Sequence, residues 1–305
     1  MKAENKKLKK ALFPLIAGSF LLLGGCATSS GFTSVLSAAG EIANAAGYGE
    51  AGAALNAGAS VSKAMEDITP ENEYYIGRAV AATILTNYRI QYNPVKQAYL
   101  NKICNTIAIN SANPEPFNGY HVVILDSSEV NAFATSGGHI FITSGLLACT
   151  NSEDAVAATI AHEMAHIQLQ HSLKAIKTSR WTSAGINAAG AAVAVAKKDA
   201  ELANTMNDMV GDVVTNMVNN GYSQSQEFDA DARALTLMSL SGYNPRAMLD
   251  MLSLLKSSQA GKTGGMYKTH PSPEKRIANV NKELAKLSLP SDTTNFRTAR
   301  FAKNK

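Results

Sequence analysis

The pentapeptide His162-Glu163-Met164-Ala165-His166 constrains this chain more than any other feature, because it predicts a helix with a metal-binding face. Residues four apart on an α-helix lie on the same face, one turn apart, so His162 and His166 can reach one ion. Glu163 projects beside them, where a carboxylate can take a proton from an attacking water molecule. The pattern therefore predicts metal-assisted hydrolysis with Glu163 as the general base.

The residues around the motif predict a helix over about residues 152–175. Asn151 or Ser152 can cap its start, and the acidic residues that follow favour the first turn of a helix. The apolar residues that recur at helical spacing are Val156, Ile160, Met164 and Ile167. Because residues 155–161 are almost wholly apolar, the polar motif residues need a bound partner if they are buried. The alternative is that His162 and His166 are buried and satisfied by hydrogen bonds without a metal. The glutamate between them makes this alternative less favourable.

A tetrahedral zinc ion that holds two histidines and a water molecule needs one more protein ligand. Glu227 and Asp231 open a second helix-like stretch and share a face because they are four residues apart. One of them can bind the metal while the other accepts the ring N–H of a ligating histidine. A solvated acidic helix start is the alternative interpretation of the pair. His171 lies five residues after His166, about 140° round a helix, so we expect it at the helix end or behind the ligands.

Two further stretches complete a pattern that resembles the M48 (Ste24-like) zinc metallopeptidases, in particular their soluble bacterial periplasmic lipoprotein members. The stretches that carry the resemblance are Asn131-Ala132-Phe133-Ala134 with Gly137-Gly138-His139-Ile140, His162 to His166, Glu227 to Asp231, and His270-Pro271-Ser272-Pro273 with Arg276. They span roughly residues 70–285. We therefore expect an α+β, zincin-like fold that is mainly helical, with a small β-sheet and the active-site helix described above.

The resemblance also implies roles for individual residues. His162, His166 and Glu227 are expected to bind one Zn²⁺ per chain, with Glu163 as general base and Asp231 orienting a ligand from behind. His270 is expected to approach the metal from a C-terminal loop. The segment from Asn131 to Ile142 is expected to form an edge strand on which the substrate lies extended. The expected substrate-binding residues are Asn131, Ala132, Phe133 and Gly138.

His270 admits two opposed roles at the metal. The loop that carries it follows Gly264-Gly265 and leads into Pro271, so it combines a flexible approach with a stiff exit. Bound to zinc, His270 would silence the enzyme; withdrawn, it can stabilise the oxyanion that develops during hydrolysis. A surface histidine is the alternative. Our hypothesis is that both roles occur, in a closed resting state and an open active state.

The N-terminus predicts the cellular location. A lysine-rich start and an apolar run over residues 11–25 are typical of a secretory signal peptide, and the run is shorter than the ~20 residues that span a bilayer. The Leu-Gly-Gly-Cys stretch that ends at Cys26 resembles a lipobox, so Cys26 is expected to be lipidated. The residue after it, Ala27, resembles that of lipoproteins sorted to the outer membrane. We expect a lipid-anchored protein on the periplasmic face of a Gram-negative outer membrane.

The charge of the chain bears on nucleic-acid binding, and its cysteines bear on whether it contains a disulfide. The formal charge of +4 comes from residues 1–25, so the mature chain is neutral and has no basic patch for nucleic acid. Beyond Cys26, Cys104 and Cys149 remain in an oxidising compartment. Either they form one disulfide or they are two buried thiols.

The expected organisation is one catalytic domain with flanking segments. The predicted boundaries are 1–25 for the signal peptide, 26–66 for a lipidated Ala/Gly/Ser-rich tether, 67–290 for the metallopeptidase domain and 291–305 for a polar C-terminal tail. Within the domain, helices are expected to begin at Pro70 and Pro94, and strands to lie at 120–125 and 139–143. Residues 179–220 form either two packed helices, which we favour, or a mobile flap.

The function that these features favour is zinc-dependent endopeptidase activity on unfolded or misassembled cell-envelope proteins. An open edge strand recognises extended main chain more than particular side chains. The alternative is a chaperone-like lipoprotein that helps assemble outer-membrane proteins and whose zinc site is normally closed. A purely structural zinc conflicts with Glu163, since a closed structural site has no use for a general base. The expected partners are envelope polypeptides, the membrane through the lipid, and the outer-membrane-protein assembly machinery.

Overall fold

The structure is a computed structural model that describes residues 68–174, 221–257, 266–287 and 294–304, and a few single positions between 37 and 56. The four ranges lie within one compact unit. The expected signal peptide, Cys26, all but single positions of the tether, and the 179–220 segment lie outside the described residues. None of the described helices is long and apolar enough to cross a bilayer.

A four-stranded mixed sheet with strand order β1-β2-β4-β3 forms the centre of this unit. The strands are β1 (Arg89–Ile90), β2 (His121–Asp126), β3 (Ala132–Thr135) and β4 (His139–Thr143). Strands β2 and β4 are parallel, and β1 and β3 run antiparallel to their neighbours. The two predicted strands are present as β2 and β4. The segment between them contains β3, an edge strand among the described residues, and the short 3-10 turn η2 (Ser136–Gly138).

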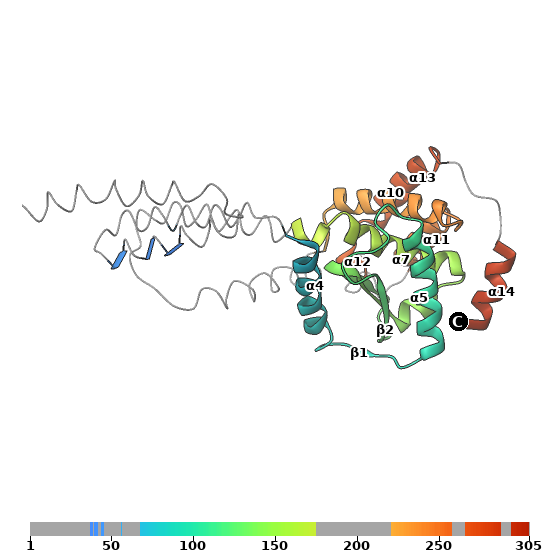
Figure 1. Ribbon diagram of the computed structural model, residues 1–305. Helices are drawn as coiled ribbons and strands as arrows, with labels where there is room; N and C mark the ends of the chain where they lie inside the picture. Colours follow the sequence, from blue (N-terminus) through green and yellow to red (C-terminus); the bar gives the residue numbers. More distant parts are fainter. Residues whose placement is uncertain are drawn as a thin grey trace, which may run out of the picture. The chain divides into compact units, whose positions relative to one another are not determined.

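The two faces of the sheet bury different side chains because successive residues of a strand point to opposite sides. Ile140 and Ile142 face the larger core cluster, which contains residues of α5 (Pro94–Ile109) and α7 (Glu153–Gln168). Phe133 and Phe141 face the smaller cluster beneath α4 (Pro70–Ile84). Figure 1 shows α4 and α5 on either side of β2. The sheet therefore holds α7, the motif helix, against one face.

The helix starts follow the capping signals of the sequence. Thr69 and Asn93 accept hydrogen bonds from the first turns of α4 and α5, each of which has a proline near its start as predicted. Ser152 caps α7 through the N–H of Ala155. Helix α7 ends at Gln168, earlier than the predicted 175, because Gln170 adopts a left-handed conformation with φ 53°.

Three C-terminal helices and a short helical turn come next among the described residues. They are α10 (Gln224–Leu240), α11 (Ala247–Ser257), the short α12 (Met266–Thr269) and α13 (Pro273–Leu284). Helices α10 and α11 pack against α7, while α13 packs on α10 and α11. Ser223 and Gln226 form a reciprocal capping box at the start of α10. Helix α10 lies along α7 and brings its first turn, which contains Glu227, to the motif.

The expected polar tail at 291–305 instead contains a packed helix, α14 (Thr294–Asn304). Phe301 joins the larger core cluster, while Arg297 and Arg300 form ion pairs with Asp154 and Glu153 in the first turn of α7. Both carboxylates are buried, so each requires a cationic partner. Two arginines of this polar segment thus neutralise carboxylates at the start of the motif helix.

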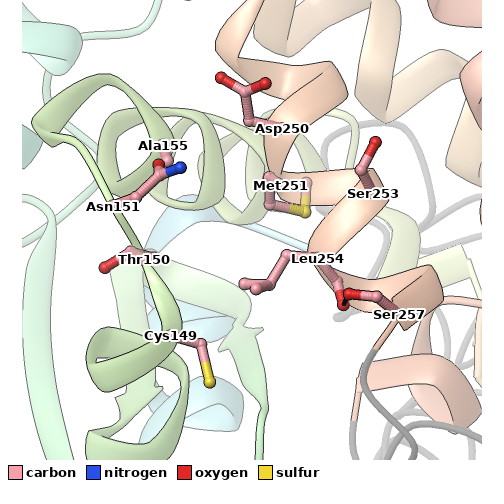
Figure 2. A pocket seen from close by; sticks show the side chains of 9 residues that line it. All are labelled: Cys149, Thr150, Asn151, Ala155, Asp250, Met251, Ser253, Leu254 and Ser257. Carbon is pink, nitrogen blue, oxygen red and sulfur yellow. Dashed lines mark hydrogen bonds between the residues drawn. The ribbon is translucent and has the colours of Figure 1, made fainter.

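The disulfide considered between Cys104 and Cys149 is absent from the structure, in which both cysteines are free. Cys104 is fully buried in α5 within the larger core cluster. Cys149 is exposed at the end of α6 (Ser144–Cys149) and lines a pocket of about 360 Å³ between the start of α7 and α11 (Figure 2). The two thiols are therefore in separate environments, and only Cys149 faces solvent.

Candidate metal centre

Four buried donors from three parts of the chain converge beside the sheet. His162 and His166 come from α7, Glu227 from α10 and His270 from the residue after α12. Each of the four residues is at most 1% exposed. Their donor atoms all lie within 4.8 Å of one another, and they are the one such group among the described residues. This set of four is called the donor cage below.

The distances within the donor cage show that it can hold a cation. The Nε2 atoms of His162 and His166 are 3.1 Å apart, and Nδ1 of His270 is 3.2 Å from Nε2 of His162. Glu227 Oε1 lies 3.0 Å from Nδ1 of His270 and 3.4 Å from Nε2 of His166. A neutral imidazole nitrogen without hydrogen carries a lone pair, so nitrogens that face one another need a proton or a metal ion between them. The donor cage therefore fits a metal ion.

Glu163 lies next to the donor cage without a hydrogen-bond partner among the described residues. Its carboxyl group is fully buried, and Oε1 is 3.3 Å from Nε2 of His270. Burial raises the pKa of Glu163, although the charges of His270 and His162 act in the other direction. A buried carboxyl without hydrogen bonds is costly, and such groups concentrate at functional sites. The position suits a group that exchanges protons with a reacting molecule.

The two carboxylates of α10, whose roles the sequence pattern left open, take different positions. Glu227 points into the donor cage, whereas Asp231 lies behind His162, with Oδ1 3.0 Å from Nδ1 of that histidine. Burial and Arg276 act against a charge on His162, but its contacts with Asp231 and Glu227 raise its pKa to about 9. An Asp231 contact at Nδ1 leaves Nε2 of His162 directed at the cage.

His171 lies behind His166, as expected for a residue outside the ligand set, but not by continuing the helix. Because α7 ends at Gln168, the chain turns at Gln170 and brings Nδ1 of His171 to 2.8 Å from Nδ1 of His166. Burial, aided by Lys174, lowers the pKa of His171 to about 4, so it is a neutral acceptor. His166 can then donate from Nδ1 while Nε2 remains free for a metal.

Arg276 joins the two carboxylates of α10, a contact that sequence reasoning missed. This guanidinium on α13 is fully buried; Nη1 lies 2.7 Å from Glu227 Oε2, while Nη2 and Nε donate to Asp231 at 2.7 and 2.8 Å. Burial alone would raise the pKa values of both carboxyl groups, but Arg276 holds them below their usual range. The arginine thus keeps a potential ligand and its supporting carboxylate ionised.

Tyr222 is a second residue near the metal centre that sequence reasoning missed. Its ring stacks on the ring of His166, with centroids 3.9 Å apart and an interplanar angle of 17°. Tyr222 is 8% exposed, and its backbone N–H donates to the carbonyl of Thr269 at 3.0 Å. The one local signal is its place five residues before Glu227, which does not predict a ring stack.

Helix α12 carries His270 and lies against the start of β3. The N–H of Met266 donates to the carbonyl of Val130 at 3.1 Å, and Oγ1 of Thr269 is 3.5 Å from Oδ1 of Asn131. The N–H of His270 donates to the carbonyl of Met266 at 2.7 Å. These contacts place the His270 ring in the donor cage, with its second nitrogen toward Glu163. The structure therefore places His270 among the other three donors.

The hydrogen-bond register of β3 determines which of its groups face away from the sheet. The N–H of Thr143 donates to the carbonyl of Asn131 at 3.0 Å, so residues 131, 133 and 135 bond inward to β4. Ala132 and Ala134 direct their backbone groups outward. The ring of Phe133 packs in the smaller core cluster. Gly138 has φ 105° and lies against the backbone of Gly119, which leaves no space for a side chain. Among the expected substrate residues, Ala132 directs its main chain away from β4 but is fully buried, whereas Phe133 and Gly138 have packing roles.

Comparison with known proteins agrees with this geometry. The family model described as peptidase family M48 matches residues 94–284, which include the whole donor cage. The chain is 25% identical over 218 residues to a beta-barrel assembly-enhancing protease of Yersinia pestis, covering 70% of this chain and 43% of that protein. It is 28% identical over 186 residues to metalloprotease LoiP of Escherichia coli K12, covering 61% of this chain and 69% of the relative. It is also 28% identical over 176 residues to metalloprotease YcaL of the same strain, covering 58% and 65%.

The matched segment contains strands β2, β3 and β4, the motif helix and all four donors. The chain spans less than half the length of the beta-barrel assembly-enhancing proteases that it matches, and about two thirds of the two metalloproteases. Because the family model covers more than half of the chain and every element that builds the donor cage, this protein belongs to peptidase family M48.

Proposed function

We propose that this protein is a zinc-dependent endopeptidase that hydrolyses peptide bonds of unfolded or misassembled cell-envelope proteins. The observation that carries the proposal is the buried donor cage with Glu163 beside it, a carboxyl group that has no hydrogen-bond partner among the described residues. Family membership and relatives named as metalloproteases support the reaction class. The substrate class is supported by the edge strand and by the relatives named as beta-barrel assembly-enhancing proteases.

The donor cage suits zinc by donor type and spacing. Histidine nitrogens and a carboxylate oxygen bind Zn²⁺ at about 2.0–2.2 Å, so neighbouring donors of a tetrahedral site are roughly 3.3–3.6 Å apart. The donor separations of 3.0–3.5 Å around the cage lie close to this range. A bound zinc ion would polarise a peptide carbonyl and make water more acidic.

The residues of the chain then supply proton transfer and alignment. Glu163 accepts a proton from the attacking water and returns it to the leaving amine, and its raised pKa makes it a better base than an exposed carboxylate. Asp231 and His171 hold the rings of His162 and His166 from behind. Arg276 keeps Glu227 ionised as a ligand.

The outward backbone groups of β3 supply the substrate contact. Ala132 and Ala134 are 0% and 3% exposed, so an extended polypeptide can pair with them as an additional strand only after this edge is uncovered. Such pairing recognises main chain and tolerates many side chains. Unfolded proteins offer such segments, whereas folded proteins bury theirs. The first outward carbonyl, that of Val130, is already bound by Met266. A substrate that pairs along the whole edge must therefore displace α12 and, with it, His270.

His270 accordingly has both roles in this proposal. In the closed arrangement its Nδ1 occupies a donor position and its Nε2 lies 3.3 Å from the general base, so water and substrate are excluded. Once α12 is displaced, the imidazole can donate a hydrogen bond to the oxyanion that develops on the scissile carbonyl. Substrate binding shifts the population from the closed to the open arrangement.

The protein is expected to act at the periplasmic face of the outer membrane, anchored by lipid on Cys26. The lipobox-like sequence and the relatives named as beta-barrel assembly-enhancing proteases support this location. Incorporation of labelled palmitate that depends on Cys26 tests the anchor. Incorporation that survives the substitution Cys26→Ser would exclude it.

A paired experiment tests the chemistry. Zinc content and casein cleavage are measured for the parent protein, Glu163→Gln and His166→Ala. Glu163→Gln should retain stoichiometric zinc but lose about 10²–10⁴ in cleavage rate, because only the proton acceptor is removed. His166→Ala should lose zinc as well. Cleavage by Glu163→Gln at the rate of the parent, with contaminating protease excluded, would refute the assignment.

The closed position of His270 favours one second candidate, a chaperone-like lipoprotein that helps assemble outer-membrane proteins and rarely opens its zinc site. Replacing His270 by Ala separates the two functions. If closure limits the rate, cleavage should increase; if oxyanion stabilisation limits it, cleavage should fall by a large factor. Unchanged zinc affinity and unchanged cleavage together would exclude any role at the metal. If neither the parent protein nor the His270→Ala variant cleaves casein, the result would favour the assembly function.

A further inference from the structure

We infer that Tyr222 is a positioning residue for the metal ligand His166, whose ring it holds by stacking. This inference deepens the proposed zinc-dependent function and rests on it. The tyrosine belongs neither to the pentapeptide nor to the carboxylate pair. Its ring nevertheless makes the closest ring contact in the metal centre, at 3.9 Å between centroids.

The neighbours of His166 show why a stacked ring is needed. His162 and His171 meet it edge-on, at 82° and 70°, and the ring of His270 is tilted against it at 58°. One hydrogen bond at Nδ1 restrains rotation about the Cβ–Cγ bond, but neither it nor the edge-on rings cover a face of the imidazole. Tyr222 lies nearly parallel to the imidazole plane, at 17°, and covers one face of it. The hydrogen bond and the stacked ring together define the direction of Nε2, the atom that faces the metal.

Tyr222 is itself held firmly, which a positioning residue requires. Its backbone N–H is bound to the carbonyl of Thr269, and the following residue, Ser223, caps α10. Tyr222 is therefore placed by the same helix that carries Glu227 and by the turn that carries His270. A shift of either element moves the ring against His166. The ring centroid also lies 5.6 Å from that of His270, so Tyr222 contacts both the fixed and the displaceable donor.

The stack should strengthen when the metal is bound. A ligating imidazole gives electron density to the cation, and the face of a phenol ring is electron-rich. The face of the Tyr222 ring is therefore better matched to a metal-bound His166 than to the free imidazole. Residues that orient ligands in this way typically change metal affinity about 10–100-fold when they are replaced.

The test compares ring retention with ring loss in the full-length protein. Tyr222→Phe keeps the ring and Tyr222→Leu removes it, and Tyr243→Leu is the control for loss of a buried tyrosine remote from the donor cage. Zinc affinity is measured by competition with a chromophoric chelator, and the visible spectrum of the Co²⁺-substituted protein reports the ligand geometry. Thermal unfolding of the metal-free variants shows whether each one folds; Tyr222→Met replaces the Leu variant if the latter does not.

We expect about a 10–100-fold loss of zinc affinity and a changed Co²⁺ spectrum for Tyr222→Leu. Tyr222→Phe and Tyr243→Leu should bind zinc within about threefold of the parent. Parent-like affinity and spectrum in Tyr222→Leu would overturn the inference, and so would an equal loss in Tyr222→Phe, since the hydroxyl would then be responsible. A parent protein that binds no zinc would instead refute the proposed function, which keeps the two failures distinct.

Discussion

Replacing Arg276 by Met tests whether the buried carboxylates of the metal centre depend on the charge of this arginine. Methionine retains much of the buried volume but removes the charge that contacts Glu227 and Asp231. All three side chains are fully buried, so water cannot replace the lost cation. Two carboxylates whose pKa values are lowered mainly by Arg276 would remain in the interior without it.

The magnitude follows from this burial. Removing one partner from a buried ion pair typically costs about 3–5 kcal/mol. For a domain of this size, each kcal/mol shifts the midpoint of thermal unfolding by roughly 2–4 °C, so we expect a decrease of about 6–20 °C in the metal-free protein. With zinc present, the cation lies against Glu227 and offsets part of the lost charge, so the decrease should be smaller. Adding Asp231→Asn to Arg276→Met should also recover part of the stability.

Thermal and urea unfolding of the full chain, each with chelator and with excess zinc, provide the assay. Arg233→Met is the matched control, because Arg233 lies on α10 and its Nε donates to a neutral amide, that of Gln168. A loss below about 1 kcal/mol for Arg276→Met in chelator, or a loss equal to that of the control, would show that the buried carboxylates do not depend on this guanidinium.

Four further outcomes follow from the structure. In the Cys26→Ser protein, a thiol reagent should modify Cys149 rapidly and Cys104 only on unfolding. If both cysteines react only after reduction, the outcome would support a Cys104–Cys149 disulfide instead. Burial raises the pKa of Cys104 from 9.0 to about 12. Between these two pH values the unfolded chain loses a proton that the folded chain retains. The contribution of Cys104 to the free energy of unfolding is therefore complete below pH 9 and decreases as the pH rises. Cys104→Ala should therefore flatten the alkaline decrease in unfolding free energy, and an unchanged slope would contradict the assignment. Arg297→Met should destabilise the protein by about 3 kcal/mol, since Arg297 is 7% exposed and binds buried Asp154, whereas an exposed arginine of α14 contributes less; equal effects of Arg297→Met and Arg300→Met would contradict this. Chelation should abolish cleavage and lower the midpoint of thermal unfolding, and added zinc should restore both. Cleavage that persists in chelator would show that the activity does not depend on this metal centre.

Helix signals in the sequence predicted much of the local structure. Thr69 followed by Pro70, and Ser152 followed by acidic residues, specify helix starts through capping and dipole interactions that depend only on neighbouring residues. The end of α7 was missed, because nothing in the local pattern indicated that Gln170 adopts a left-handed conformation. That one turn places His171 behind His166.

The sequence by itself determined the part of the metal centre that follows helical periodicity. His162 and His166 share a face because they are four residues apart, and the same spacing relates Glu227 and Asp231. Spacing cannot tell which carboxylate enters the cage, since that depends on how α10 is rotated against α7. The family resemblance implied this assignment, but its physical reason is tertiary: the packing of α10 places Glu227 inside and Asp231 behind.

Contacts between residues distant in the chain were likewise decided by packing alone. Arg276 reaches Asp231 across 45 residues, and Arg297 reaches Asp154 across 143. The sequence shows these arginines as charges in polar segments, with no sign of burial. Their ion pairs form because buried carboxylates require cations, and the folded chain brings α13 and α14 to the positions where those carboxylates lie.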